Sequence, residues 1–454
     1  MKMKIVKNVE DAVNGRVLAP GSRIYSSGLA STPQMIFRQM AADTGIRDVD
    51  LMGVLYLGEV SALFAEEPCQ RVTHRVIFAS HPSREALNKG WAKYQLMHLG
   101  DIPMQVRGYY KPDMVVLTVA GPDKGGNYSM GTTIEGTLAA IQTAKANNGI
   151  VIAERNARMP FILGTTIPGE WIDYLVDTDY PLPASPAPLQ DEASRRIGRM
   201  IAGRFIHDGS TIQYGIGQVP EAVTDAILEK GVKNLGIHTE LFADAMRRLV
   251  LEGAVSNCYT NPGGRFSTAT LFLAGDQAGY DWLDFNSVVQ NRPSDFTNNP
   301  MVIAQQPDMV AINSAIGVDF HGNVWADSMK AREIYSGVGG QCDFIRGANL
   351  SHGVAIIAMK STTSRGASKI VDMCPEGITT TAIAADPVVI VTENGAFDPR
   401  GLSISERAVG IAHLAEAGHK EQLLKKIYES PEFHHPKDAL KNGMPKGFIP
   451  YDAV

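Results

Sequence analysis

The sequence predicts an α/β protein made of two duplicated, open α/β domains with mostly parallel sheets. Three observations support this fold class. Short apolar segments of strand length alternate with helix-like segments, one proline-rich stretch divides the chain, and the two resulting parts share motifs in the same order. Continuous apolar strands that alternate with helices are typical of parallel sheets covered by helices on both faces.

The proline-rich stretch is residues 178–190, TDYPLPASPAPLQ, which holds four prolines. Proline fixes its own φ angle and has no N–H to donate, so such a stretch cannot continue a helix or an inner strand. We therefore expect a first α/β domain over residues 1–185 and a second over residues 191–454.

The predicted elements follow one another as strand and helix. In open parallel sheets ligands bind beyond the carboxyl ends of the strands, so candidate site residues are expected there. The predicted strands are 24–28, 50–57, 75–80, 113–121 and 149–154 in the first part, and 211–217, 234–238, 309–315, 354–359 and 388–393 in the second. The clearest predicted helices are 133–146, 220–230 and 405–416.

Four pairs of segments indicate an internal duplication, which should be settled before motifs are interpreted because it fixes the architecture. The alternative is that short strand–turn–helix units resemble one another by chance. The pairs are 21–36 with 209–223, 50–54 with 234–237, the PDMV segments from Pro112 and from Pro307, and 150–157 with 388–396.

Composition and charge exclude several classes of protein. The 454 residues are 44% apolar and 20% charged, as in an ordinary globular protein, and the net charge of −6 creates no general attraction for nucleic acid. The four cysteines form no CxxC pair, and we expect reduced, mostly buried thiols. The polar beginning and the shortness of the apolar runs predict a cytoplasmic protein with no membrane partner.

Several familiar site motifs are absent. Pro220 occupies the third glycine position of a GxGxxG pattern, and the chain has no GK[ST], HExxH or GxSxG sequence. The eleven histidines show no paired ligand spacing, so no metal site is expected.

Two glycine loops remain as candidate sites, because exposed N–H groups at tight turns can hold an oxyanion or a phosphate. Each can also be a simple turn. Lys360 ends a predicted strand after the second loop and is either a phosphate contact or a surface charge. The candidate residues are Gly215, Ile216, Gly217, Gln218, Val219 and Pro220 in the first loop, and Gly337, Gly339 and Gly340 in the second.

Glu240 follows a short predicted strand in the segment LGIHTELF. A carboxylate beyond a strand end fits catalysis in this fold class. A glutamate at a helix start is also a common cap or partner of the helix dipole, and the residues alone leave both interpretations open.

Five motifs resemble the class I CoA-transferase family, in the branch of 4-hydroxybutyrate, butyrate and acetate CoA-transferases and acetyl-CoA hydrolases. This resemblance extends over essentially the whole chain. It implies that Glu240 is the nucleophile, that residues 215–220 and Gly340 contact CoA or the thioester oxygen, and that Asn298 and Lys360 lie near the reacting groups and CoA. The motifs are GIGQVP (215–220), GIHTELFAD (236–244), NNP (298–300), SGVGGQCDFIRGA (336–348) and TENGAFDPRGLSISER (392–407).

The implied activity is transfer of CoA between an acyl-CoA and a free acid through a glutamyl-CoA thioester, with no cofactor beyond that co-substrate. The expected partners are acyl-CoA, small carboxylic acids and further copies of the chain in a homo-oligomer, with no nucleic acid. An acyl-CoA hydrolase that uses the same Glu240 is one alternative. A non-catalytic ligand-binding protein on the same fold is another.

The residues after Glu240 depart from a generic member of this branch. Met246 is followed by two arginines, Arg247 and Arg248, which are candidates for binding the second carboxylate of a diacid such as succinate or itaconate, in preference to butyrate or 4-hydroxybutyrate. The alternative is that the arginines lie on the solvated face of a helix.

Overall fold

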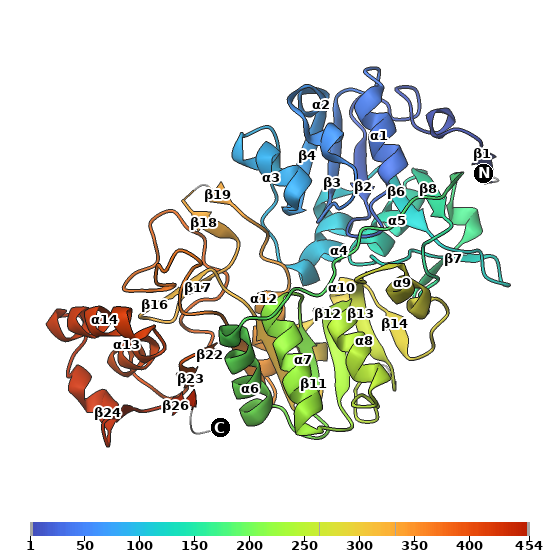
Figure 1. Cartoon of the computed structure of the whole chain (residues 1–454). Coiled ribbons are helices and arrows are strands. Elements are labelled where there is room, and N and C mark those ends of the chain that lie inside the picture. Colours follow the sequence, from blue (N-terminus) through green and yellow to red (C-terminus); the bar gives the residue numbers. More distant parts are fainter. Residues whose placement is uncertain (1–2, 263, 332, 452–454) are drawn as a thin grey trace.

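A computed structural model describes residues 3–262, 264–331 and 333–451 (Figure 1). Its first sheet has eight strands in the order β1-β10-β8-β6-β2-β3-β4-β5, and every neighbouring pair is parallel. We call the part built on this sheet the first domain. Its strands are β1 (Lys4–Val6), β2 (Arg23–Ser26), β3 (Val49–Val54), β4 (Val72–Phe78), β5 (Lys93–Tyr94), β6 (Met114–Val119), β8 (Ile150–Asn156) and β10 (Tyr174–Thr178).

The second sheet has nine strands in the order β14-β13-β12-β11-β15-β20-β22-β23-β26, and defines the second domain. It is parallel from β14 to β22, and β23 and β26 add an antiparallel edge. Its strands are β11 (Thr211–Tyr214), β12 (Gly236–Ala243), β13 (Ser267–Leu273), β14 (Val289–Asn291), β15 (Met309–Asn313), β20 (Val354–Ala358), β22 (Val389–Thr392), β23 (Gly395–Phe397) and β26 (Phe448–Pro450).

The two sheets repeat one strand order, as the predicted duplication requires. The order β5-β4-β3-β2-β6-β8-β10 corresponds to β14-β13-β12-β11-β15-β20-β22. Three of the four predicted segment pairs keep their positions in this correspondence. The pairing of 150–157 with 388–396 is wrong, because β8 lies beside β6 whereas β22 lies one strand beyond β20. Both β8 and β22 are buried parallel strands with similar polar residues at or just after their ends, so their sequences look alike although their places in the two sheets differ.

The predicted helices form, but each begins or ends at a different residue from the one predicted. Helix α5 (Thr137–Ala146) begins four residues after the predicted start at 133, because Ile134 donates its N–H to Thr270 O in the second domain. Helix α7 (Gln218–Lys230) begins two residues before Pro220, with Gly217 as its N-cap at φ 123°. Helix α13 (Ile404–His413) ends three residues before the predicted 416.

The remaining α-helices belong to one or the other domain. They are α1 (Gln34–Ala42), α2 (Glu66–Arg71), α3 (His81–Asn88) and α4 (Ile102–Gln105) in the first domain, and α6 (Glu192–Phe205), α8 (Asp244–Leu251), α9 (Gln277–Leu283), α10 (Ser294–Thr297), α11 (Pro300–Ile303), α12 (Gln341–Asn349) and α14 (Ala417–Glu429) in the second. The short strands outside the two sheets are β7 (Asn127–Ser129), β9 (Thr166–Pro168), β16 (Gly317–Asp319), β17 (Val324–Trp325), β18 (Ser328–Lys330), β19 (Glu333–Ile334), β21 (Ile370–Val371), β24 (Leu440–Lys441) and β25 (Met444–Pro445).

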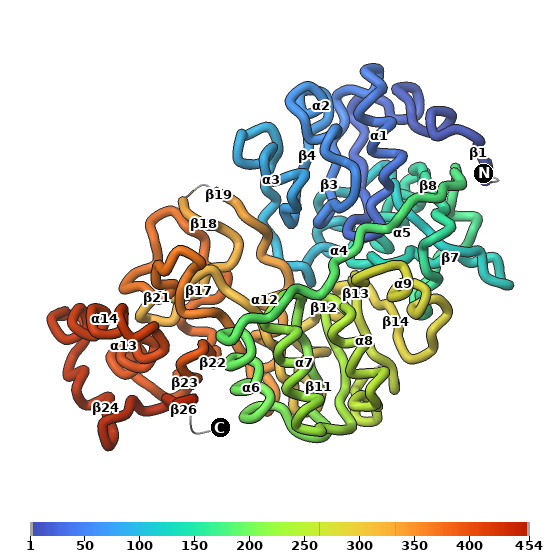
Figure 2. The backbone as a smooth tube through the Cα atoms, in the orientation of Figure 1, coloured from blue at the N-terminus to red at the C-terminus, as the bar shows by residue number. Residues whose placement is uncertain are grey.

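The domains meet through a continuous apolar core. One cluster of buried side chains includes Leu117 of β6 and Ile134, just before α5, from the first domain, and Leu271 of β13 from the second. In Figure 1 the blue-to-teal first domain lies above the green-to-yellow part of the second domain, with α4 and α10 between them. Residues 179–191 contain no helix or strand, and Figure 2 shows them running from the first sheet to α6. Burial of this apolar surface fixes the face from which the first domain approaches the second.

The four cysteines are free, as predicted, but only Cys342 is buried. The other three lie partly exposed, which corrects the expectation of mostly buried thiols. None of the helices in the described part of the chain combines the length and the apolar character needed to cross a bilayer.

Candidate active site

Glu240 lies inside β12 rather than after it. The strand continues to Ala243 because Leu241, Phe242 and Ala243 pair with β13 in parallel register. The next helix, α8, starts only at Asp244, with Ala243 as its N-cap. Glu240 is therefore neither a helix cap nor a first-turn partner of the dipole, and the catalytic interpretation of this carboxylate is the one that the geometry favours.

One hydrogen bond and one backbone N–H are directed at the Glu240 carboxylate. Asn298 Nδ2 donates to Glu240 Oε2 at 2.8 Å, and the backbone N–H of Gly340 faces the same carboxylate. A Cβ atom on Gly340 would overlap both Glu240 Oε2 and Asn298 Nδ2, so an alanine there would displace both side-chain ends. Gly339 lies beside the other oxygen. A Cβ atom placed on Gly339 would lie 3.5 Å from Glu240 Oε1, and the φ angle of this glycine is +60°. The second glycine loop and Asn298 thus meet the predicted nucleophile.

The side-chain amide of Asn298 is held in one orientation by its neighbours. Thr297 Oγ1 donates to Asn298 Oδ1 at 3.0 Å, which identifies the oxygen and leaves the amide nitrogen facing the carboxylates. His238, on the same strand as Glu240, bonds through Nε2 to Thr297 O at 2.8 Å. Burial lowers the pKa of His238 to about 4, so the ring is neutral and Nε2 carries its proton.

Burial also raises the pKa of Glu240 to about 7, although the hydrogen bond from Asn298 and the nearby Gly340 N–H favour the ionised form. A carboxylate with such a pKa is a stronger base than an ordinary glutamate and still ionises near neutral pH. Both properties suit a carboxylate nucleophile.

A titration of activity checks this pKa. Because only ionised Glu240 is nucleophilic, kcat/KM is expected to fall about tenfold per pH unit below about 7 and to level off above it. The measurement is kcat/KM for an acyl-CoA between pH 5 and 9, with protein stability checked at each pH. A midpoint at the ordinary value of 4.5 would mean that Glu240 is not desolvated in the free enzyme.

The second glycine loop is held by the first domain. Ala79 N donates to Ser336 O at 3.2 Å and Leu99 N to Gly339 O at 3.0 Å. The space beside Gly337 is occupied by the end of β4, since a Cβ there would lie 2.6 Å from Ile77 O. The geometry around Glu240 therefore depends on contacts from both domains.

The first glycine loop follows β11, the strand next to β12. Nothing lies within 4 Å of a Cβ placed on Gly215 or on Gly217, and the Ile216 side chain is 48% exposed. Open space therefore adjoins the N-terminus of α7, and contact of residues 215–220 with CoA stays a prediction. Val219 and Pro220 lie in the first turn of that helix.

Lys360 joins the first loop. Its Nζ donates to Gln218 Oε1 at 2.7 Å and also pairs with Asp191. The side chain remains 32% exposed, so its ammonium group lies at the mouth of this loop and is partly hydrated.

The residues proposed for acid recognition already have other partners. Met246 is fully buried in the apolar core. Arg247 Nε pairs with Asp244 Oδ1 at 2.8 Å, and Arg248 pairs with Glu221 at 3.3 Å and with Asp225. The guanidinium groups are thus balanced by carboxylates of α7 and α8.

The sequence-based prediction missed several residues that complete the site. Asp343 contacts Asn298 through Oδ2 at 3.3 Å, and Gly100 of the first domain donates its N–H to the same oxygen at 3.0 Å. Asp343 stands inside the quoted motif SGVGGQCDFIRGA, which was a usable signal. Gly100 is 243 residues away and carries no motif.

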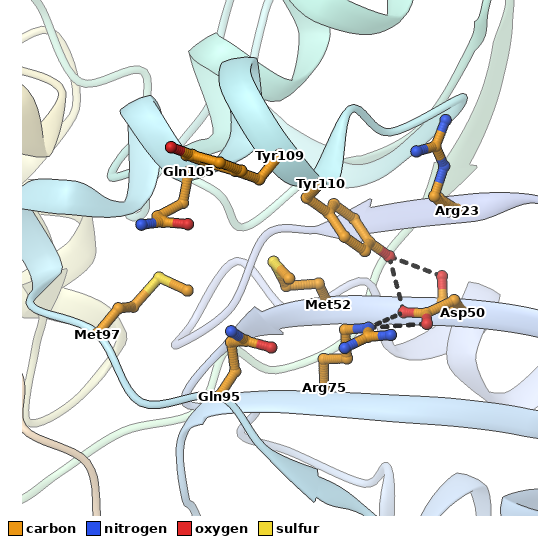
Figure 3. A pocket seen from close by; sticks show the side chains of 9 residues that line it. All are labelled: Arg23, Asp50, Met52, Arg75, Gln95, Met97, Gln105, Tyr109 and Tyr110. Carbon is orange, nitrogen blue, oxygen red and sulfur yellow. Dashed lines mark hydrogen bonds and ion pairs between the residues drawn. The ribbon is translucent and has the colours of Figure 1, made fainter.

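A separate cavity of about 260 Å³ lies in the first domain (Figure 3). Its polar groups bond to one another: Arg75 Nε pairs with Asp50 at 2.8 Å, and the Tyr110 hydroxyl donates to Asp50 O at 2.8 Å. Figure 3 shows Asp50, Arg75 and Tyr110 on one side of Met52, with Met97, Gln105 and Tyr109 on the other side. Arg23 also lines the cavity and pairs with Asp113 at 3.3 Å, so the charged side chains of the cavity already have partners.

Two family models match the chain. Residues 4–184 match the acetyl-CoA hydrolase/transferase N-terminal domain and residues 275–427 the C-terminal domain of the same family. The 4-hydroxybutyrate coenzyme A transferase of Clostridium kluyveri is 36% identical over 371 residues, which cover 80% of this chain and 84% of that protein. The chain belongs to the acetyl-CoA hydrolase/transferase family. The family and enzyme class predicted from the five motifs are confirmed by these matches.

Other members of the acetyl-CoA hydrolase/transferase family widen the range of related activities. The succinyl-CoA:acetate/propanoyl-CoA:succinate CoA transferase of Fasciola hepatica is 33% identical and covers 91% of this chain and 86% of its own. The acetyl-CoA hydrolase of Kluyveromyces lactis is 26% identical, covering 77% of this chain and 75% of its own.

Solved structures confirm the fold class of this family member. RipA from Yersinia pestis superposes with a TM-score of 0.86 at 26% identity, covering 94% of this chain and 97% of that chain. A 4-hydroxybutyrate CoA-transferase from Porphyromonas gingivalis gives a TM-score of 0.78 at 28% identity with the same coverage.

Proposed function

We propose that this protein is a CoA-transferase that moves CoA between an acyl-CoA and a free carboxylic acid, through a thioester on Glu240. The observation that carries the proposal is that Asn298 Nδ2 donates to the buried Glu240 carboxylate, which the Gly340 N–H also faces. Family membership and the naming of relatives as 4-hydroxybutyrate and succinate CoA-transferases support it.

The proposed reaction begins with attack of a Glu240 oxygen on the thioester carbonyl. Collapse of the tetrahedral adduct breaks the carbon–sulfur bond, which gives a mixed anhydride and CoA thiolate. The thiolate then attacks the glutamyl carbonyl, and the first acid leaves as a carboxylate. A second acid repeats these steps in reverse, so atoms and charge balance without a redox partner or a metal.

The contacts fit the charge that develops. When the thiolate attacks the glutamyl carbonyl, the negative charge grows on a Glu240 oxygen that already faces Asn298 Nδ2. One preorganised donor of this kind is typically worth about 3 kcal/mol in the transition state.

Steady-state kinetics test the order of events. Because the first acid leaves before the second binds, double-reciprocal plots at several acceptor concentrations are expected to be parallel, with a chelator making no difference. Intersecting lines would require both substrates to be bound at once, which the covalent scheme does not allow.

Hydrolysis by the same Glu240 is the second candidate, because a relative is an acetyl-CoA hydrolase. Water would then replace the acceptor acid. The ratio of new acyl-CoA to free CoA, followed by mass over a panel of acids, separates the two activities. The predictions of a cytoplasmic homo-oligomer and of no nucleic-acid partner remain to be tested.

The preference for a diacid also stays a prediction. Arg247→Ala and Arg248→Ala are expected to reduce kcat/KM for succinate or itaconate by about tenfold or more, with little change for butyrate or 4-hydroxybutyrate. Since both arginines are paired with carboxylates, a wild type that prefers butyrate would identify them as structural ion pairs.

A further inference from the structure

Asp343 links the candidate nucleophile to the first domain. It lies near the start of α12 and is 7% exposed. Its Oδ2 accepts two hydrogen bonds, from Gly100 N at 3.0 Å and from Asn298 Nδ2 at 3.3 Å. The contact is close, since a Cβ on Gly100 would lie 3.2 Å from Asp343 Oδ2 and 2.9 Å from Asn298 O.

The two hydrogens of Asn298 Nδ2 are therefore divided between two carboxyl groups. One points to Glu240 Oε2 and the other to Asp343 Oδ2. The terminal torsion of an asparagine side chain is broad when nothing restrains it. Because the amide is planar, fixing its second N–H also fixes the direction of the first.

The docking of the first domain fixes Asp343 in turn. Leu99 N donates to Gly339 O, and the next N–H along the chain, of Gly100, donates to Asp343. Adjacent amides of one segment thus hold the glycine loop and the carboxyl group that orients Asn298.

We propose that Asp343 is a positioning residue that aims the Asn298 amide at Glu240 when residues 98–101 of the first domain are docked. This inference rests on the proposed function, since it concerns the donor to the glutamyl oxygen. What matters is an acceptor oxygen at the position of Oδ2, and the negative charge is not required.

The chemistry of the site agrees with that distinction. Burial, and secondarily the charge of Glu240, raise the pKa of Asp343 to about 8. A proton on Oδ1 leaves Oδ2 free to accept both hydrogen bonds, so the orientation of Asn298 is kept in either protonation state.

Paired variants test the proposal. Asp343→Ala removes the acceptor and is expected to lower kcat about a hundredfold with KM for acyl-CoA changed little, because a small misplacement of a catalytic group costs that much. Asp343→Asn keeps one acceptor oxygen and is expected to retain kcat within about fivefold. Asp343→Ser, whose hydroxyl is too short to reach, replaces the alanine variant if that variant does not fold.

The decisive comparison uses Asn298→Ala as the background. If Asp343 acts through Asn298, adding Asp343→Ala to the Asn298→Ala variant changes kcat by less than about threefold. The reason is that the effects of substituting residues that act together are not additive. Asp319→Ala is the matched control: this carboxyl is 2% exposed and accepts hydrogen bonds from the N–H groups of Gly322, Asn323 and Cys374, among others. It is expected to lower the unfolding temperature and to leave kcat within about twofold.

Three results would overturn the proposal: kcat retained in Asp343→Ala, an equal loss in Asp343→Asn, or the full hundredfold loss repeated in the Asn298→Ala background. The proposed function is tested separately in the wild type by its CoA adduct on Glu240. If that adduct forms and Asp343→Ala makes it at the wild-type rate, only the inference about Asp343 is wrong.

Discussion

Glu240→Gln is expected to abolish CoA transfer, with kcat reduced by at least about 10⁴-fold, the scale of loss when a covalent nucleophile is removed. The amide has nearly the shape of the carboxylate, but it cannot form the anhydride or the thioester.

Glu135→Gln is the matched control for that variant. Glu135 is a buried carboxyl of the first domain whose pKa burial also raises to about 7, and it accepts a hydrogen bond from the Tyr25 hydroxyl at 2.8 Å. Its substitution is expected to leave kcat within about fivefold. Full transfer activity in Glu240→Gln, in protein shown by mass to be free of deamidation, would remove Glu240 from the mechanism.

Gly340→Ala is expected to lower kcat by about 10²- to 10³-fold. The new methyl group would overlap Glu240 Oε2 and Asn298 Nδ2, so both side chains must move. Unfolding temperature and acyl-CoA turnover are measured together, because the loss is expected in turnover and not mainly in folding.

Gly108→Ala provides the comparison for this substitution. A Cβ at Gly108 meets nothing within 4 Å, so the same chemical change is made in open space. Equal activities in the two alanine variants would show that the close approach of Gly340 to Glu240 is not needed for catalysis.

The alternation of apolar strands and helices predicted both sheets, since buried parallel strands are apolar on both faces. β13, for example, is buried along all seven residues. The sequence pattern predicted the wrong helix start where backbone groups of one domain form hydrogen bonds with the other domain. Residues 133–136 have helical composition, yet Ile134 N and Glu135 O bond to the second domain and delay the start of α5.

The closeness of the candidate nucleophile Glu240, Asn298 and the second glycine loop could be expected because each lies in a recognisable motif. The strand position of Glu240 could not, since the pairing of Leu241–Ala243 with β13 depends on a partner strand whose register no local pattern specifies. The contribution of residues 98–101 was also hidden, because it consists of backbone N–H groups, which any residue other than proline carries.

Intact mass of the wild-type protein after incubation with an acyl-CoA, with no acceptor acid, tests the central claim most directly. The account predicts a mass increase equal to CoA less one water, without the acyl group, which peptide mapping assigns to Glu240 and an added acid discharges as its CoA ester. An acyl group on the protein, or steady transfer with no CoA adduct at any time, would contradict it.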